Sequence, residues 1–157
     1  MIHGCCVLVL ALQSPIKVGV YDHQGSFLHA FQSPKQASFA LAEIFDALLA
    51  WIEDHQLSLQ AIYYAKGPGS LMAMKLAHVF LHTFSLVRSL ELYSALGFAF
   101  NNNAPIKAFG KMGYVLEGDQ IRLVPCDSQL PPLNLPKHLD RALFTQDNQP
   151  IYLLPPV

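Results

Sequence analysis

Two consecutive segments with helical periodicity, residues 33–54 and 71–88, constrain the fold of this 157-residue chain most, because both are unusually apolar. At about 100° per residue, the polar side chains of the first segment occupy an arc of about 100°, and its apolar side chains spread over about 220°. The second segment has one narrow polar stripe, formed by Lys75, His78, His82 and Ser85. Because one sheet does not cover apolar arcs this wide, the pattern predicts that another surface packs on both helices.

Short apolar runs between turn residues predict the strands around these helices. Three strands are expected first, over residues 6–12, 17–21 and 26–31, and a fourth over 61–65 between the helices. Ser33 is followed by a proline and is expected to cap the first helix, with the proline at its first position. The order of elements indicates an α/β fold.

A run of three asparagines before Pro105 predicts a boundary between two lobes. The N-terminal lobe is expected over residues 1–103, with a short helix at 94–100, and a reduced C-terminal lobe over 104–157. Three short strands in the second lobe repeat the opening meander, and they are expected over residues 106–109, 112–116 and 121–124. The proline-rich tail is expected to lie extended on the surface.

The composition excludes several classes of protein. With 52% hydrophobic and 13% charged residues, the chain is not expected to be disordered, and a net charge of −1 argues against binding nucleic acid by charge alone. The longest uninterrupted apolar run, residues 4–12, falls far short of the roughly 20 residues that cross a bilayer. The three cysteines lack metal-ligand spacing and favour a reducing compartment. A cytoplasmic protein with no membrane association is therefore predicted.

The Gly-Pro-Gly-Ser turn at residues 67–70 allows two interpretations. Ser70 is suited to cap the following helix. Alternatively, backbone N–H groups of Gly67, Gly69 and Ser70 form an anion-binding turn at the helix start, with Lys66 beside it. Because no Gly-Lys-Ser/Thr follows, as a phosphate-binding loop requires, the structural interpretation is favoured.

Catalytic and metal sites find little support among the polar residues. A phosphotransferase needs a carboxylate at the tip of its first hairpin, where this chain has Gln13. A two-metal nuclease needs converging acids, whereas Glu43 and Asp46 lie on one face of a helix. His78 and His82 are spaced as metal ligands are, but the sequence shows no third ligand, so a polar helix edge is favoured over a metal site. Neither a catalytic residue nor a metal or cofactor is expected.

The predicted order of elements is that of the ribonuclease-H-like and actin/Hsp70-kinase folds, and residues 64–76 resemble the Gly-Pro-Gly-Ser turn and following helix of the TsaB (YeaZ) family. The chain departs from the family at Leu12-Gln13-Ser14, where the family commonly has Asp-Thr-Ser or Asp-Thr-Ala, and after Ser70, where Leu71, Met72, Ala73 and Lys75 replace Phe, Thr, Gly and Arg. It therefore resembles a divergent, shortened member. Three further stretches agree with the family in order, namely Leu10–Leu12 with Val18–Val20, Lys111–Val115 and Pro150–Leu153.

The resemblance implies a non-catalytic scaffold that dimerises with a TsaD-type enzyme, which transfers a threonylcarbamoyl group to the adenosine beside a tRNA anticodon. ATP would belong to that enzyme, a TsaE-type ATPase is a further candidate partner, and tRNA would be contacted only indirectly. A homodimer through the same helices is an alternative, as are an ATP-binding phosphotransferase or peptidase-like enzyme of the same fold and a self-associating structural module. The predicted interface comprises Leu41, Ile44, Phe45, Leu48, Met72, Lys75, Leu76, Val79 and Phe80.

Overall fold

The computed structural model describes residues 2–127, 129–149 and 151. Its main element is a five-stranded sheet of order β3-β2-β1-β4-β5, in which β2 and β3 run antiparallel to their neighbours and β4 and β5 run parallel to β1. The strands of this sheet are β1 (His3–Leu10), β2 (Ile16–Asp22), β3 (Phe27–Ser33), β4 (Leu57–Gly67) and β5 (Glu91–Leu96).

Strand β1 is central because its apolar residues are buried on both faces of the sheet. Val7 and Val9 belong to the core beneath one face, whereas Leu8 and Leu10 belong to the core on the other. Val7 pairs with Val20 of β2 and with Ile62 of β4. A continuous apolar run is typical of a strand covered on both sides, as the sequence pattern predicts.

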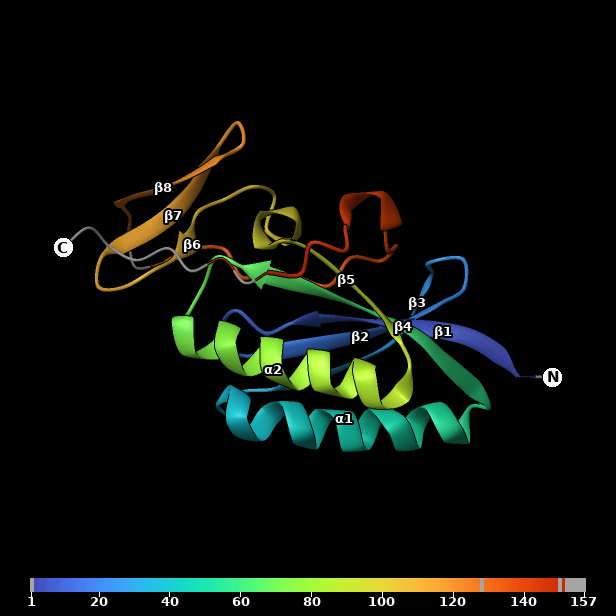
Figure 1. The fold of residues 1–157 in the computed structure, drawn as a ribbon. Coiled ribbons are helices and arrows are strands. Elements are labelled where there is room, and N and C mark those ends of the chain that lie inside the picture. Colours follow the sequence, from blue (N-terminus) through green and yellow to red (C-terminus); the bar gives the residue numbers. More distant parts are fainter. Residues whose placement is uncertain (1, 128, 150, 152–157) are drawn as a thin grey trace.

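Helices α1 (Ala37–Asp54) and α2 (Leu71–Arg88) lie side by side on one face of the sheet (Figure 1). The Phe45 ring of α1 contacts the rings of Phe80 and Phe84 of α2, with centroids 5.0 and 4.9 Å apart. The wide apolar arc of α1 is therefore covered by the sheet and by α2 together. The prediction that α1 needs a surface from outside the chain is wrong, because its neighbouring helix supplies that surface.

The opposite face of the sheet is covered by the segment 131–148, which we call the strap. Leu133, Leu139 and Phe144 of the strap are buried in the second core, so this segment does more than lie extended on the surface. Figure 1 shows it crossing the sheet on the side away from the helices. Hydrogen bonds from Tyr21 to the Pro136 carbonyl (2.7 Å) and from Lys17 to the Leu133 carbonyl (2.8 Å) hold it there.

A smaller antiparallel sheet, of order β6-β7-β8, stands at one end of the molecule (Figure 1). Its strands are β6 (Ile106–Lys107), β7 (Met112–Glu117) and β8 (Gln120–Pro125), close to the three predicted. The division into lobes at residues 103 and 104 stays a prediction. In the predicted family signature at Pro150–Leu153, only Ile151 lies within the described residues.

Two local predictions are wrong. The helix predicted at residues 94–100 is the end of β5 followed by the 3-10 turn η1 (Gly97–Phe100), because Ser94 and Ala95 pair with β4 and are buried in the sheet. Ser33 ends β3 and does not cap α1; Gln36 stands at the cap position without a side-chain hydrogen bond. No helix in the described part of the chain is long and apolar enough to cross a membrane.

Candidate functional site

Helix α2 presents a line of apolar side chains to solvent. Met72, Val79 and Leu86 follow one another at intervals of seven residues, which places them along one side of the helix. Their exposed fractions are 65, 63 and 82%, and Val87 beside them is 77% exposed. We call Met72, Val79, Leu86 and Val87 the apolar line. Large exposed apolar side chains gathered on one side of a helix are typical of a contact surface, and here the exposed Lys75 and Thr83 stand between them.

The polar stripe of the same helix turns toward the protein, with the exception of Lys75, which is exposed. His78 and His82 are half-buried, and Ser85 is only 6% exposed. Burial, followed by the nearby His82, lowers the pKa of His78, so its neutral form is favoured. Helix α2 therefore differs from an ordinary amphipathic helix, because most of its polar stripe faces the protein while several of its apolar side chains face solvent.

The predicted partner interface is divided by the structure into two groups. Met72, Lys75 and Val79 are exposed, and Leu76 and Phe80 are half-buried at the edge of α2. The α1 residues of the prediction lie in the chain's own core and do not form a surface; this corrects the assignment of Leu41, Ile44, Phe45 and Leu48. The candidate surface is therefore narrower than predicted and belongs mainly to α2.

Four large exposed apolar residues of this helix layer lie outside the predicted interface, and one of them is Leu71 at the start of α2. Leu86 and Val87 continue the line on α2, and Phe39 of α1 is 66% exposed. The apolar arc of the second helical segment contained Leu86 and Val87, so the periodicity signalled them. The sequence of the helix does not show which part of that arc faces the sheet, because the same types of apolar residue occur on the buried side and on the exposed side.

The turn at residues 67–70 and the adjacent Lys66 form hydrogen bonds with other parts of the chain. The Ser70 N–H donates to the Leu12 carbonyl (3.3 Å), and the Ser70 hydroxyl accepts from the Ala73 N–H (3.4 Å), which caps α2 as the sequence predicts. Lys66 donates to the Asp147 carbonyl of the strap (2.8 Å) and is not directed at an anion. An anion-binding role for Gly67, Gly69 and Ser70 stays a prediction, with fewer free donors than the sequence suggested.

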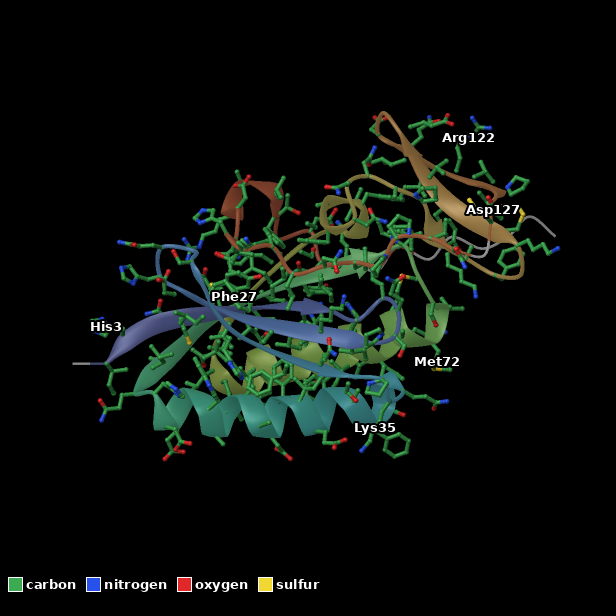
Figure 2. All side chains as sticks on the ribbon, turned by 180° about the vertical axis from the view of Figure 1, so that it is seen from behind. His3, Phe27, Lys35, Met72, Arg122 and Asp127 are labelled. Atoms are coloured by element: carbon green, nitrogen blue, oxygen red, sulfur yellow. The ribbon has the colours of Figure 1, made fainter. Side chains whose placement is uncertain are left out.

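A cavity of about 580 Å³ lies between the first hairpin and the starts of both helices. Gln13, Ser70 and Leu76 line it, and so do Lys35 and Met72, which Figure 2 shows at the same end of the helix layer. No aspartate or glutamate lines this cavity in the described chain, and Lys35 forms an ion pair with Glu43 (2.9 Å) on the exposed surface. Gln13 therefore contributes an uncharged amide to this cavity.

Among the described residues, no three histidine, cysteine, aspartate or glutamate side chains are grouped so that they could hold a metal ion. Glu43 and Asp46, the acids that the sequence places on one helix face, are exposed on the outer side of α1, as is Glu53. Asp22 is the last residue of β2, and its carboxylate accepts hydrogen bonds from the backbone N–H groups of Gln24 and Ser26 in the following turn, at 2.9 Å each.

These features define a mixed α/β protein with a five-stranded sheet, a two-helix layer on one face and an exposed helix surface. YeaZ from Pseudomonas aeruginosa has the same fold, with a TM-score of 0.58 and 14% identity over 88% of this chain and 72% of that one. The same values hold for an uncharacterized protein with similarity to peptidase YEAZ from Pseudomonas aeruginosa. No family model and no curated protein sequence matches the chain. The predicted resemblance to YeaZ is confirmed in the fold.

Proposed function

We propose that this chain is a non-catalytic scaffold subunit of the TsaB type, which dimerises with a TsaD-type enzyme that transfers a threonylcarbamoyl group to the adenosine beside a tRNA anticodon. The YeaZ fold is consistent with this role. The single observation that carries the proposal is the apolar line on α2, because the chain leaves these four side chains of the helix layer uncovered.

The geometry of the apolar line suits a helix from a partner. Side chains repeated every seven residues recur along one side of a helix, so a partner helix that lies along this side would contact all of them. Covering a fully exposed Met, Val or Leu side chain contributes about 1.5–3 kcal/mol. Met72, Val79 and Leu86 are 63–82% exposed, so covering them contributes a few kcal/mol toward the affinity of a complex.

The cavity at the first hairpin supports a role without chemistry of its own. Binding metal and phosphate there requires a carboxylate, and Gln13 has no charge with which to hold a cation. ATP would then belong to the partner enzyme, and tRNA would meet this subunit only indirectly. We further propose that the five-stranded sheet corresponds to a ribonuclease-H-like lobe of the actin/Hsp70-kinase class, and that the protein works in the cytoplasm.

Co-purification of the full chain with a TsaD-type protein tests the proposal. Val79→Asp places a charge in the middle of the apolar line, and we expect it to weaken the complex at least about tenfold, since the carboxylate would lose its water without gaining a partner. Asn103→Asp is the matched control, because it adds the same charge at an exposed site outside the helix layer. A complex that forms equally well with Val79→Asp would exclude this surface as the interface.

Leu48→Asp is unsuitable for this experiment, although the sequence suggests it. Leu48 is 0% exposed, so the variant would bury a charge and unfold the chain whatever the interface. The oligomeric state of the isolated chain, measured by light scattering, addresses the homodimer. A dimer that Val79→Asp converts to a monomer would assign the same surface to self-association, and the TsaD-type protein would then compete for it.

A further inference from the structure

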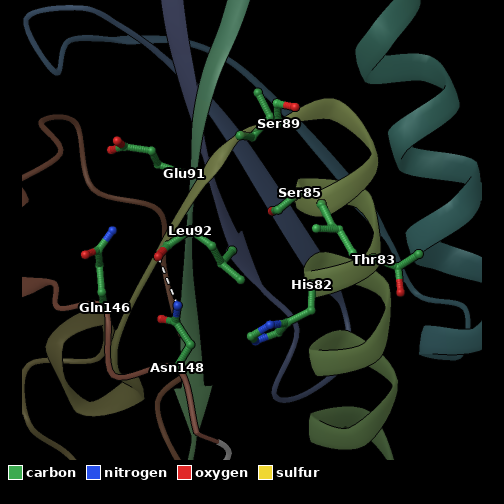
Figure 3. A pocket seen from close by; sticks show the side chains of 10 residues that line it. His82, Thr83, Ser85, Ser89, Glu91, Leu92, Gln146 and Asn148 are labelled. Carbon is green, nitrogen blue, oxygen red and sulfur yellow. Dashed lines mark hydrogen bonds between the residues drawn. The ribbon is translucent and has the colours of Figure 1, made fainter.

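The two edges of the five-stranded sheet are protected to different degrees. At the β5 edge, the Asn148 side chain of the strap donates to the Leu92 carbonyl (3.0 Å), as Figure 3 shows, and the strap also pairs with Ser94. At the β3 edge, within the described chain, the strap pairs only with the beginning of the strand, where the Phe27 N–H donates to the Lys137 carbonyl (3.1 Å). The rest of β3 is left as an uncovered edge.

The open part of this edge is the segment 29–32. A bulge at the beginning of β3 leaves Leu28 without a partner in β2, and regular pairing resumes with His29 opposite Val20. Among the described residues, no backbone group outside β2 forms a hydrogen bond with the main chain of residues 29–32. An unpaired strand edge offers a row of N–H and C=O groups to another strand.

The composition of β3 does not protect this edge. Edge strands often carry Lys or Pro, which discourage pairing with another chain. Strand β3 reads Phe-Leu-His-Ala-Phe-Gln-Ser, so it contains neither of these residues and no Asp, Glu or Arg. Phe27 and Leu28 at its beginning are exposed apolar residues. The strand is therefore suited to strand addition, in which an extended segment of another chain joins a sheet.

Helix α1, which packs beside β3, determines the charge of this region. The Trp51 ring of α1 stacks on the His29 ring of β3, with centroids 5.0 Å apart. The helix contains no Lys or Arg. Its four acidic side chains are all exposed, namely Glu43, Asp46, Glu53 and Asp54. Lys35 offsets one of them through its ion pair with Glu43 (2.9 Å). A strand added to β3 would therefore lie near a negatively charged helix.

We propose that the β3 edge binds an extended segment of a partner protein in which Lys or Arg alternates with apolar residues. Side chains of an added strand alternate between the two faces of the sheet, so every second one would lie on the side of α1. Basic side chains on that side are attracted to the α1 acids. Apolar side chains would lie on the opposite face, where β3 exposes Ala30. Backbone hydrogen bonds supply affinity, and the basic side chains supply selectivity.

A second copy of this chain is less suited to the same edge. Two β3 strands that pair antiparallel are related by a two-fold axis perpendicular to the sheet, so both helix layers lie on the same face. This arrangement would bring the two acidic α1 helices close together across the joint, and like charges repel. The surface is separate from the apolar line on α2, so the proposal goes beyond the scaffold function.

NMR titration of the full chain with a synthetic peptide tests the proposal. The probe is Lys-Val-Lys-Val-Lys-Val-Lys, and Glu-Val-Glu-Val-Glu-Val-Glu is the control of opposite charge. We expect saturable binding of the basic peptide alone, with the largest amide shifts at residues 29–32 and slower hydrogen exchange there. Equal binding of both peptides, the largest shifts elsewhere, or an absence of saturable binding would overturn the proposal.

A pair of matched variants tests the edge itself. Ala30→Lys adds a repelling charge to the open part of β3, and it should weaken binding of the basic peptide at least about threefold. Ala142→Lys adds the same charge to the strap and should bind the peptide as the wild type does. Both alanines are exposed, so both variants are expected to fold. Equal affinities of the two variants would contradict the assigned edge.

A second pair tests the role of the α1 charge. Asp46→Asn/Asp54→Asn removes two charges from α1 and should weaken binding at least about threefold at low ionic strength. Asp119→Asn/Asp127→Asn removes two exposed charges near the smaller sheet and should leave the affinity unchanged. Equal weakening in both double variants would show an effect of net charge alone and would overturn the proposed complementarity.

Two further measurements distinguish this proposal from the scaffold function and from self-association. Val79→Asp should bind the basic peptide as the wild type does, because Val79 lies on α2, away from β3. Light scattering should give the same molar mass for Ala30→Lys and the wild type. A wild-type dimer that Ala30→Lys converts to a monomer would assign the edge to a second copy and overturn the proposal.

Discussion

Ser94 and Thr145 exchange two backbone hydrogen bonds, of 2.8 and 2.9 Å, although they lie in β5 and in the strap. Strand β5 is at the edge of the five-stranded sheet, so its outer N–H and C=O groups would otherwise be open to pairing with another chain. The strap thus protects this edge at Ser94 as well as covering one face of the sheet.

Replacement of Thr145 by proline should loosen the strap. Thr145→Pro removes the N–H that donates to the Ser94 carbonyl, and we expect a loss of about 1–3 kcal/mol in the free energy of unfolding. Thr145→Ser is the control, because it keeps both backbone bonds and the hydroxyl that accepts from Asp147. Urea unfolding measures the difference, and hydrogen exchange at the Ser94 amide should become faster in Thr145→Pro. Equal stability of the two variants would contradict the role of this contact.

Leu48 lies in the core and Val79 on the surface, although both belong to the predicted interface. Truncating these two side chains should therefore change the free energy of unfolding by very different amounts. Leu48→Ala should cost about 2–5 kcal/mol, because it opens a cavity beneath the sheet. Val79→Ala should stay within about 0.5 kcal/mol of the wild type, since Val79 is 63% exposed in the isolated chain. Thermal and urea unfolding of the monomeric chain check both values. A large loss in Val79→Ala would mean that the apolar line is already covered.

The carboxylate of Asp22 should make the β2–β3 turn sensitive to acid. Hydrogen bonds from the Ser26 backbone, and then from that of Gln24, hold the pKa of Asp22 below its ordinary value of 3.8. Since the folded state prefers the charged form, its stabilisation is present above pH 3.8 and is lost as the pH falls through the lowered pKa.

Asp22→Asn tests this prediction. At pH 7 the variant should lose less than about 1 kcal/mol, because the turn is partly exposed, and the gap from the wild type should close as the pH falls below 4. Urea unfolding across this pH range gives both quantities. A gap that is independent of pH would show that the carboxylate charge is not involved.

The three cysteine thiols should differ in reactivity. Burial, and then the neighbouring Cys6, raises the pKa of Cys5 to about 11, and burial also raises the pKa of Cys6. Below both values, a thiol of pKa 11 contains about a hundredfold less thiolate than one of pKa 9.0. Cys126 is half-buried and should be modified first by a disulfide reagent at pH 8.

The thiol count before and after denaturation tests this difference. We expect one fast thiol in the native chain and three in urea, and no fast thiol in native Cys126→Ser. Rapid modification of Cys5 or Cys6 in the native chain would show that the β1 end of the sheet opens readily.

The helices and most strands were predictable because their signals are local. The continuous apolar run in β1 and the Gly-Pro-Gly-Ser turn before α2 define those elements without reference to the rest of the chain. The 3-10 turn at Gly97 was mistaken for part of a helix, since Ser94 and Ala95 are recruited into the sheet by pairing with β4. Tertiary pairing here overrides local preference.

The candidate surface was only partly predictable. Periodicity showed that both helices are too apolar for one sheet, and it included Val79 in the apolar arc. It could not show that α1 would be covered by α2 through Phe45, Phe80 and Phe84, because contacts between helices depend on their placement in space. Leu48 was therefore assigned to a partner when it belongs to the core.

Element type and order follow from the residue pattern, because hydrophobic periodicity and turn chemistry act within a few neighbouring residues. The orientation of α2 about its own axis and the path of the strap arise from packing between distant segments. That packing exposes Val79, buries Ser85, and brings Asn148 to His82. Long-range burial of apolar area, which is non-directional, selects this arrangement, and no short stretch of the chain contains it.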